Sequence, residues 1–400
     1  MKNNTKSSLK ISYFGKFLLF SVIFLVVFGA LMVYSSSFYM AERNYGNKFF
    51  FLIKQVIGIV LGLVCMLFLS KVDYKSLSKF SIPLLVISFV LLLLVFVPFI
   101  GVENYGARRW IRLPFFTLQP SEIAKFSFVL FSATYLSRHS NDVKNFKALL
   151  PVLLIGISFC GLIILEPNMS ITMCVAFIMI FMLFIGGMSF KHFVIFATLA
   201  LIAVPVLILM EPYRLLRLLA FLDPWASPKG EGYQLIQSFF SVSNGGLLGV
   251  GLFNSRQKYL FLPFAESDFI FAVIAEEWGL IGSILVLLVY FMVVFSGIVI
   301  AKRAKDRFGC LLASGITSVI AIQTLLNLCV ILGLIPPTGL PLPFISAGST
   351  SLVVFLSAIG VLLNIDRQSQ NTNRTFIFAQ DDNININKRA VKLKDNKSRA

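Results

Sequence analysis

Charged side chains are scarce in this 400-residue chain, where Asp, Glu, Lys and Arg together make up only 13% of the residues. An ordinary soluble domain holds about 25% of these residues. Apolar residues, in contrast, reach 58%. Length alone would allow two or three soluble domains. A soluble fold cannot bury this much apolar surface, so lipid must be the solvent for most of the chain.

Metal and disulfide patterns are also missing. The five cysteines show neither the spacing of a metal site nor that of a secreted disulfide framework, so we interpret them as small apolar residues. The net charge of +17 raises the question of nucleic acid. The basic residues, however, lie mainly in tails and short loops and not on one aromatic-bearing surface, so no nucleic-acid partner is expected.

Long apolar runs are abundant. A membrane-spanning helix needs about 20 mostly apolar residues. An all-α polytopic membrane protein of about ten transmembrane helices is therefore predicted, with a long extracytoplasmic loop at about 211–267 between the seventh and eighth spans. The first span is too long for a signal peptide, and more spans follow it. The predicted spans are 17–38, 49–70, 80–100, 122–137, 148–165, 169–187, 190–210, 270–300, 309–334 and 348–364.

The distribution of basic residues predicts the orientation. An even number of spans puts both termini on one side, and most of the 35 Lys and Arg residues fall there. Both termini are therefore expected to be cytoplasmic. The membrane domain, 17–364, lies between a cytoplasmic tail, 1–16, and a disordered basic cytoplasmic tail, 365–400. Both tails are suited to contact anionic lipid.

Basic residues on the opposite, outer side are grouped. One group is in the loop that follows the third span, and the other is in the long loop. Positive charge retained on the disfavoured side indicates an anionic ligand, and pairing with lipid headgroups or nearby acids is the alternative. The groups are Arg108, Arg109 and Arg112, and then Arg214, Arg217, Lys229, Arg256 and Lys258.

A lysine enters the apolar part of the fourth span. Ser121 is placed as an N-cap, with Glu122 favourable in the first turn. Lys125 then lies one turn inside the span, where a charge costs about 2.5–3.5 kcal/mol at mid-bilayer and less near the interface. Lys125 either pairs with Glu122 or faces a polar cavity, with Trp110 at the level of the headgroups.

The long outer loop begins with a second candidate binding element. Residues 213–219 place two arginines three positions apart among four leucines, which predicts a short interfacial helix able to hold a lipid phosphate. Structural interfacial helices have the same pattern. A turn at residues 221–225 ends it. The glycine-rich run at 244–252 lacks the Gly-Lys-Ser of a nucleotide loop, so it predicts a close backbone approach or a flexible turn.

Asp268 begins a very apolar helix from the outer side. As an N-cap it would be structural, and as a general base it would stand at the mouth of a cavity, and the residues alone support both readings equally. A helix N-terminus lowers the pKa of such a carboxyl, whereas desolvation and Glu266 raise it. Glu276 and Glu277, about two turns deeper, need partners or water. Structural, proton-handling and cation-binding roles stay open for them.

Four prolines interrupt the last outer connection, at residues 333–351. Irregular backbone at membrane depth persists only where protein buries it or where it lines a cavity, so a cavity wall is predicted. From the residues alone, a transporter and a lipid-modifying enzyme are equal alternatives. The prolines are Pro336, Pro337, Pro341 and Pro343.

These stretches together resemble the SEDS family (shape, elongation, division and sporulation), the membrane polymerases of peptidoglycan. The resemblance covers about residues 17–364, and details such as Gln323-x-x-x-Asn327 look more like the cell-division member than the elongation member. Asn168, Phe264, Glu266 and Ala347 depart from the family pattern. The resemblance is strongest at Gly-Ala-Arg-Arg-Trp-Ile, Gln-Pro-Ser-Glu-x-x-Lys, Phe-Leu-Asp-Pro-Trp, Gly-Tyr-Gln-x-x-Gln-Ser, Ser-Arg-Gln-Lys, Asp-Phe-Ile-Phe-Ala and Thr-Gly-x-Pro-Leu-Pro-Phe.

The resemblance implies a glycosyltransferase that joins lipid II units outside the cytoplasmic membrane. Asp268 would accept the proton of the acceptor hydroxyl, and outer cations would stabilise the departing undecaprenyl pyrophosphate. The candidate substrate-binding residues are Arg108, Arg109, Trp110, Gln119, Lys125, Arg214, Arg217 and Lys258, with supporting roles for Glu122, Glu276, Glu277 and Ser346.

The resemblance also bears on cofactors, partners and location. A divalent cation, magnesium or manganese, suits this chemistry, but no ligand motif encodes one. The implied partners are lipid II, a class B penicillin-binding transpeptidase, other divisome membrane proteins and the bilayer. The implied location is the cytoplasmic membrane of a bacterium, with the active site extracytoplasmic. A lipid II flippase, a non-catalytic divisome scaffold and an elongation-type polymerase are the alternatives.

Overall fold

The computed structural model describes residues 11–104, 107–112, 117–140, 142–143 and 145–370. Gly106 and most of both predicted tails, residues 1–10 and 371–400, lie outside this part of the chain. Helices make up most of the described residues. They are α1 (Tyr13–Tyr45), α2 (Phe50–Leu69), α3 (Tyr74–Leu77), η1 (Ser78–Phe80), α4 (Ser81–Leu94), α5 (Pro120–Arg138), α6 (Phe146–Leu165), α7 (Met169–Ile185), α8 (Phe190–Leu209), α9 (Pro212–Leu222), η2 (Pro224–Ala226), α10 (Tyr233–Gly245), α11 (Ile270–Lys302), α12 (Arg307–Ile331) and a C-terminal helix (Ser349–Gln370).

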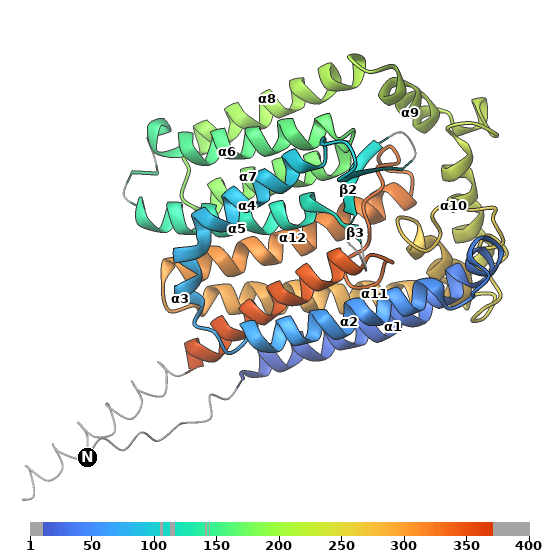
Figure 1. Cartoon of the computed structure of the whole chain (residues 1–400), viewed down its shortest axis with the longest axis horizontal. Coiled ribbons are helices and arrows are strands. Elements are labelled where there is room, and N and C mark those ends of the chain that lie inside the picture. The colour runs from blue at the N-terminus through green and yellow to red at the C-terminus, as the bar shows by residue number, and fades with distance from the viewer. Residues whose placement is uncertain (1–10, 105–106, 113–116, 141, 144, 371–400) are drawn as a thin grey trace, which may run out of the picture.

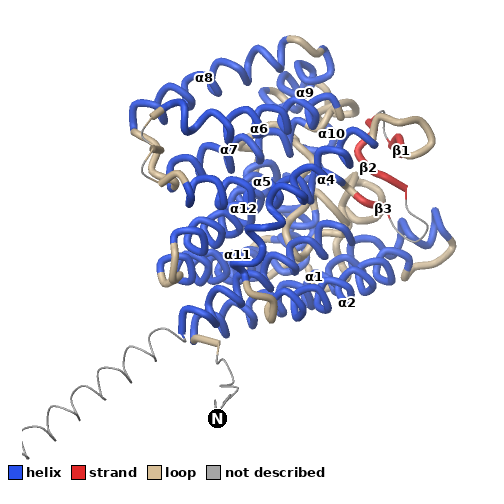
Figure 2. Tube along the Cα trace, turned by 60° about the vertical axis from the view of Figure 1, so that its left-hand side comes forward, coloured by secondary structure: helices blue, strands red, loops and turns tan. Residues whose placement is uncertain are grey.

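The prediction of a helical polytopic membrane protein is confirmed. Within the described residues, seven helices are long and apolar enough to cross a membrane: α1, α2, the continuous rod Tyr74–Leu94, α6, α11, α12 and the C-terminal helix. The other three predicted spans coincide with α5, α7 and α8. Figures 1 and 2 show these helices side by side, with α9, α10 and the strands gathered toward one end of the bundle.

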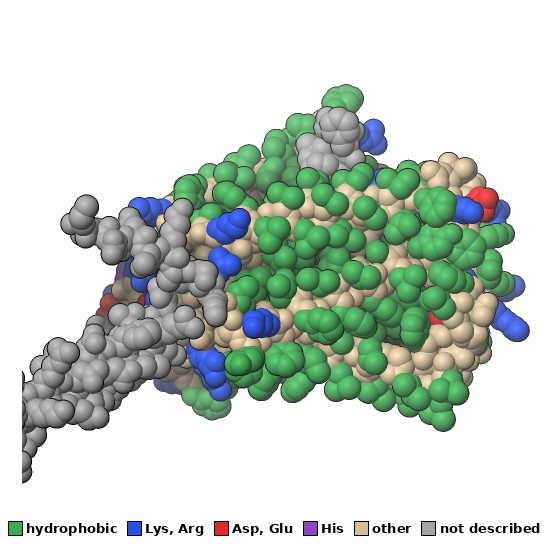
Figure 3. Space-filling view, turned by 90° about the horizontal axis from the view of Figure 1, so that it is seen from below, with side chains coloured by type: hydrophobic (Ala, Val, Ile, Leu, Met, Phe, Trp, Pro, Cys, Tyr) green, Lys and Arg blue, Asp and Glu red, His purple; other side chains and the backbone are tan. Residues whose placement is uncertain are grey.

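The outward faces of the bundle are apolar. Val64 of α2 and Phe291 of α11, for example, are 60% and 65% exposed. Leaving side chains of this size in water would forgo about 1.5–3 kcal/mol each, so lipid is the expected neighbour of these faces. In Figure 3, green apolar side chains cover the middle of the molecule, and blue Lys and Arg side chains lie mainly toward its two ends.

A small antiparallel sheet occupies the connection between α4 and α5, where the sequence predicts only a loop. Its strands are β1 (Gly101–Asn104), β2 (Ala107–Arg112) and β3 (Thr117–Leu118), in the order β1-β2-β3. Val102 pairs with Trp110, and Ile111 pairs with Leu118. The backbone pairing fixes the side of the sheet on which each side chain of β2 lies.

The helices differ in three details from the predicted cap and spans. Ser121 is not the N-cap of α5, because Gln119 is the cap residue and Pro120 takes the first helical position, for which its fixed φ is suited. Helix α1 begins at Tyr13, inside the predicted tail 1–16. The C-terminal helix continues to Gln370, six residues into the predicted tail 365–400, where Asp366 is buried and accepts hydrogen bonds from Ser12.

The long loop between α8 and α11 contains the predicted interfacial helix. Helix α9 covers residues 212–222, and the guanidinium of Arg217 lies 4.5 Å from the centre of the Tyr213 ring. The turn that follows is also as predicted, since Asp223 Oδ1 accepts a hydrogen bond from Trp225 N at the start of η2. Helix α10 then leads to the glycine-rich run.

The glycine-rich run packs on a break in α11, as a close backbone approach requires. Gly279 has φ +66° and ψ −164° and interrupts the helix. Val250 N donates to Glu276 O at 2.9 Å, and Leu280 N donates to Gly246 O at 2.9 Å. A Cβ on Gly249 would lie 2.2 Å from the Glu277 carbonyl oxygen. Glycine therefore lets one segment satisfy the polar backbone that the helix break frees.

Candidate functional site

Asp268 lies just before α11, and its side chain does not cap that helix. The N-cap residue is Phe269, without a side-chain cap bond. The Asp268 carbonyl oxygen accepts a 2.7 Å hydrogen bond from Asn327 Nδ2 of α12, and the Ser267 side chain donates to the Asp268 carboxylate. The side chain is half-buried. This geometry removes the capping alternative for the Asp268 carboxylate.

The proline-rich connection packs directly on this carboxylate. A Cβ built on Gly339, where φ is +75°, would lie 3.1 Å from Asp268 Oδ2. Glycine tolerates that backbone and keeps the space beside the carboxylate open. Pro337 O accepts a 3.4 Å hydrogen bond from Arg217 Nη1 of α9. The irregular backbone thus forms one side of the surroundings of Asp268, next to a predicted cation.

Two of the predicted cations act on Asp268. Burial raises its pKa to about 6, while the positive charges of Arg109 and Arg217 act in the opposite direction. Burial and the neighbouring charge of Arg217 both lower the pKa of Arg109. Two cations that repel each other beside a carboxylate favour an anion between them. Strand β2 and helix α9 bring these groups together from distant parts of the chain.

Backbone carbonyls hold the Arg109 side chain in place. Its Nε donates to Glu166 O at 3.3 Å, and Nη2 donates to Pro167 O. Both carbonyls belong to the turn between α6 and α7. Asn168 of the same turn caps α7 by accepting from Ile171 N at 3.3 Å. The turn therefore positions the cation without neutralising it.

Two of the residues that depart from the family pattern, Glu266 and Ala347, contact each other close to Asp268 in the chain. Ala347 N donates to Glu266 O at 2.9 Å, and Ser346 Oγ donates to Ser267 O at 2.6 Å. Burial raises the pKa of Glu266 to about 7, and the charge of Asp268 adds to this, although the backbone N–H of Glu266 opposes it. Ser346 therefore supports the backbone that carries Asp268, and Glu266 adds a second acid nearby.

Lys125 is paired in the core of the bundle. Its side chain is fully buried, as is that of Glu122, and Nζ donates to Glu122 Oε1 at 2.9 Å and to Gln323 Oε1. Glu122 Oε2 accepts from Ser351 Oγ at 3.0 Å, and Gln323 Nε2 donates to Pro341 O at 2.8 Å. The first alternative for Lys125, pairing with Glu122, is the one that the structure shows.

Lys258 is also buried. Its Nζ donates to Glu277 Oε1 at 2.8 Å and to Ser35 Oγ at 3.3 Å, with both charged side chains fully buried. Glu276 accepts hydrogen bonds from Ser255 Oγ at 2.5 Å and from the backbone N of Arg256 at 3.1 Å. Of the roles left open for Glu276 and Glu277, these contacts supply the structural one, because they fasten the loop before Asp268 to α11 and α1.

The remaining candidates lie nearer the surface. Arg108 is exposed and pairs with Glu103 at 3.1 Å, whereas Trp110, Gln119 and Arg214 are half-buried. An exposed pair of this kind contributes at most about 1 kcal/mol. These side chains come from β2, from the residue before α5 and from α9, which lie toward one end of the bundle (Figure 1).

Two amide side chains near the site were not predicted as site residues. The sequence singled them out only as a likeness to the cell-division member of the family. Gln323 and Asn327 lie four residues apart in α12, so both face the same side of the helix. Gln323 joins Lys125 to the proline-rich connection, and Asn327 Nδ2 donates to the carbonyls of both Asp268 and Leu340 at 2.7 Å. Amides at this spacing inside an apolar helix are the signal that could have identified them.

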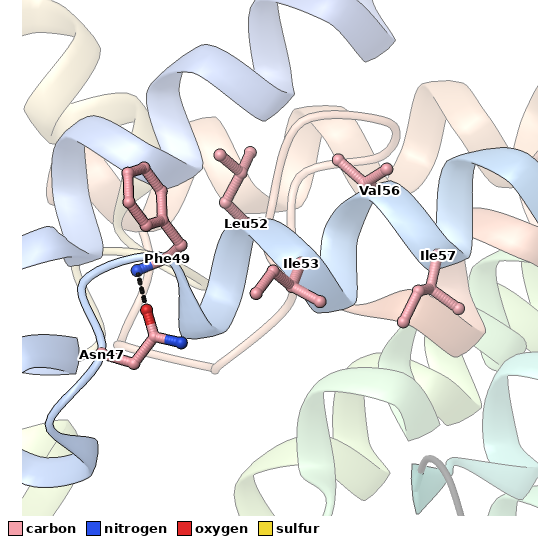
Figure 4. A pocket seen from close by; sticks show the side chains of 6 residues that line it. All are labelled: Asn47, Phe49, Leu52, Ile53, Val56 and Ile57. Atoms are coloured by element: carbon pink, nitrogen blue, oxygen red, sulfur yellow. Dashed lines mark hydrogen bonds between the residues drawn. The ribbon is translucent and has the colours of Figure 1, made fainter.

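In the described ranges, no group of three or more His, Cys, Asp or Glu side chains could hold a metal ion. A shallow hollow near the start of α2 (Figure 4) is lined by Asn47, Phe49, Leu52, Ile53, Val56 and Ile57, with Asn47 Oδ1 accepting from Phe49 N. It contains no titratable group.

Known proteins with similar sequences cover nearly the whole chain. Stage V sporulation protein E of Bacillus subtilis is 40% identical over 349 residues, which are 87% of this chain and 95% of that protein. A protein named probable peptidoglycan glycosyltransferase FtsW, from Geobacter metallireducens, is 38% identical over 374 residues, covering 93% of this chain and all of that protein.

Solved structures share the fold. A chain from a structure of a peptidoglycan synthase complex that coordinates polymerization and crosslinking matches with a TM-score of 0.73 at 29% identity, covering 88% of this chain and 97% of that one. The rod shape determining protein RodA of Thermus thermophilus matches with a TM-score of 0.65 at 26% identity, covering 88% and 96%. The family described as cell cycle protein, with FtsW, RodA and SpoVE as members, matches residues 16–371. The chain therefore belongs to the FtsW, RodA and SpoVE family, the SEDS family.

Proposed function

We propose that the chain is a peptidoglycan glycosyltransferase that polymerises lipid II on the outer side of the cytoplasmic membrane. The observation that carries the proposal is the Asp268 carboxyl group, which has a pKa of about 6 and is influenced by Arg109 and Arg217 without capping a helix. A group with that pKa is mostly ionised at neutral pH yet basic enough to accept a proton. The similarity to a protein named probable peptidoglycan glycosyltransferase FtsW and to a chain of a peptidoglycan synthase complex supports this activity.

In the proposed step, Asp268 accepts the proton of the 4-hydroxyl group of the acceptor sugar. The hydroxyl oxygen forms a bond to the anomeric carbon of the donor chain, and the bond from that carbon to the pyrophosphate oxygen breaks. Undecaprenyl pyrophosphate leaves with the electron pair, and the protonated Asp268 later returns its proton to water. One glycosidic bond forms and one glycosyl–phosphate bond breaks, so the step balances.

The cations near Asp268 have a defined part in this step. Negative charge grows on the pyrophosphate as the bond breaks, and fixed positive groups in a site of low dielectric stabilise it. Arg109 and Arg217 are the proposed ligands for that charge, with Arg108 and Arg214 guiding the lipid headgroup from outside. The buried Lys125 and Lys258 have an indirect part. Their ion pairs with Glu122 and Glu277 stabilise the helices and the loop that position the site.

Cell division is the proposed setting, and a class B penicillin-binding transpeptidase is the proposed partner. The motifs shared with the division member support the setting, and the similarity to a chain of a peptidoglycan synthase complex supports the partner. The elongation-type polymerase is the alternative setting. Depleting the protein in its own bacterium separates the two, since filaments without septa indicate division and rounded cells indicate elongation.

The activity is tested with purified protein and its partner, lipid II, and moenomycin to silence other polymerases. Glycan chains are expected from the parent protein, and none from Asp268→Ala. Equal polymer from both proteins, or none from the parent, would contradict the catalytic proposal. Lipid II scrambling that persists in Asp268→Ala without polymer would favour the flippase. Normal cell division by a bacterium whose protein has neither polymerase nor scrambling activity would favour the scaffold.

A further inference from the structure

Glu166 carries an unusual carboxyl group in the turn after α6. The residue is completely buried, and neither side-chain oxygen has a hydrogen-bond partner among the described residues. Buried polar side chains in proteins nearly always have a partner, since an unpaired one costs about 1–3 kcal/mol or more. A buried carboxyl that is left without one calls for an explanation beyond packing.

Arg109 is the charged neighbour of this group. Its guanidinium donates to the backbone carbonyls of Glu166 and Pro167, which uses two of the five N–H donors of an arginine. The same guanidinium acts on the carboxyls of both Glu166 and Asp268. One cation therefore serves two carboxyl groups that are 102 positions apart in the chain, one next to the proposed reaction and one behind it.

We propose that Glu166 is a positioning residue that acts through Arg109. While Glu166 is neutral, the charge of Arg109 is directed to Asp268 and to the anionic substrate, and when Glu166 ionises it draws that charge away. The inference rests on the proposed polymerase function and assigns to this function a residue that never touches the substrate.

Burial of the Glu166 carboxyl keeps it neutral, which leaves the charge of Arg109 to act on Asp268 and the substrate. It raises the pKa of Glu166 to about 8, and the positive charge of Arg109 partly offsets the rise. Glu166 is therefore mostly neutral at pH 7, so the charge of Arg109 remains available to the leaving pyrophosphate. An ionised Glu166 in the same low-dielectric surroundings would compensate that charge much more strongly than it could in water.

Other titratable groups lie on the elements that pack near these two residues. Cys160 of α6 and Cys174 of α7 are on the two helices that the turn connects, and the paired Glu122 and Lys125 of α5 act on Cys174. On the far side, Arg109 faces Tyr213 and Arg217 of α9 as well as Asp268. In this set, Arg109 is the one charged group that acts on the Glu166 carboxyl.

The expected signature is a fall in polymerisation on the alkaline side of the pH profile. At pH 9, one unit above the pKa of about 8, roughly nine-tenths of Glu166 is ionised. If that form is inactive, the parent keeps about one-tenth of its plateau rate at pH 9. Glu166→Gln stays neutral at every pH, so it should hold its own plateau, about tenfold above the parent when each profile is scaled to its maximum.

The test measures lipid II polymerisation from pH 5 to pH 9.5 in the presence of moenomycin. Glu103→Gln is the matched control. Glu103 is an exposed acid in the sheet that also carries Arg109, and it pairs with Arg108, the neighbour of Arg109. This control should reproduce the alkaline fall of the parent. Glu166→Asp keeps a carboxyl group and should also show an alkaline fall, which separates charge from side-chain size.

The inference is overturned if the polymerisation rate of Glu166→Gln still falls at alkaline pH. It is also overturned if the rate of Glu166→Asp does not fall there. If Glu166→Gln does not fold, infrared titration of the parent protein decides. The band of a protonated carboxylic acid must then disappear with the midpoint of the activity loss, and a band that persists through about pH 9 overturns the inference. Failure of the proposed function is a different result, namely no glycan chains from the parent at any pH.

Discussion

Lys258→Met tests whether a buried ion pair fastens the loop before Asp268 to the helix bundle. In the parent, Lys258 Nζ lies 2.8 Å from Glu277 Oε1, and both side chains are fully buried. Methionine keeps an unbranched apolar stem but removes the charge. Ser35 Oγ would still donate to Glu277, at 2.7 and 2.8 Å from its two oxygens. Ser255 N would also still donate to Glu277 Oε1, at 3.4 Å. These neutral donors do not replace the positive charge that the buried carboxylate loses.

The magnitude follows from the burial of the pair. Removing one partner of a buried ion pair costs about 3–5 kcal/mol, because the other charge stays in a medium of low dielectric. At roughly 2 °C per kcal/mol, the thermal midpoint of the detergent-solubilised protein should fall by about 6–10 °C. The midpoint is measured from the monodisperse fraction that survives heating, at one fixed heating rate.

The double variant Lys258→Met/Glu277→Gln separates charge from packing. It contains no unpaired charge, so it should be more stable than Lys258→Met alone even though it carries one more substitution. Arg256→Met is the matched control, since Arg256 is exposed and only its backbone contacts Glu276, and its stability should change by no more than about 0.5 kcal/mol. A single variant as stable as the double variant would refute the ion-pair reasoning.

Three further outcomes are expected. Because the proposed base must be ionised and the pKa of Asp268 is about 6, the polymerisation rate should fall about tenfold per unit below pH 6, and a rate unchanged at pH 5 would count against this role. Arg217→Gln removes a charge that lowers the pKa of Asp268, so this acid limb should move to higher pH, whereas Arg217→Lys should leave it nearer its place. Gly249 and Gly246 both have positive φ, +81° and +52°, so alanine strains the backbone at either position. Gly249→Ala also puts a Cβ 2.2 Å from the Glu277 carbonyl oxygen, whereas Gly246→Ala meets no atom within 4 Å, so Gly249→Ala should lower the thermal midpoint more than Gly246→Ala.

Much of the architecture could be predicted because its causes are local. A run of about 20 apolar residues forms a spanning helix whatever lies beside it, since lipid leaves no other way to satisfy the backbone. The interfacial helix at 212–222 and the close approach at Gly249 likewise follow from neighbouring residues. The small sheet between α4 and α5 was missed, because its strands have only 4, 6 and 2 residues, too few for an alternating apolar pattern to stand out.

The candidate site was also predicted only in part from the sequence. Asp268 could be identified as a carboxylate at the start of a helix, but a sequence cannot tell whether such a group caps the helix. The structure removes that alternative, because Phe269 is the cap residue and Asn327 of α12 holds the backbone of Asp268. The N-cap predicted for Ser121 fails for a related reason, since Pro120 already begins α5.

Sequence by itself determined that this chain lies in a membrane, where its spans run, and which charges stand at their ends. Only the tertiary structure decided which of those charges are partners. It pairs Lys125 with Gln323 across 198 positions and anchors Arg109 on the turn at Glu166 across 57. The physical reason is distance: burial in lipid is a property of each segment, whereas a hydrogen bond or an ion pair exists only between groups that folding brings within about 3–4 Å.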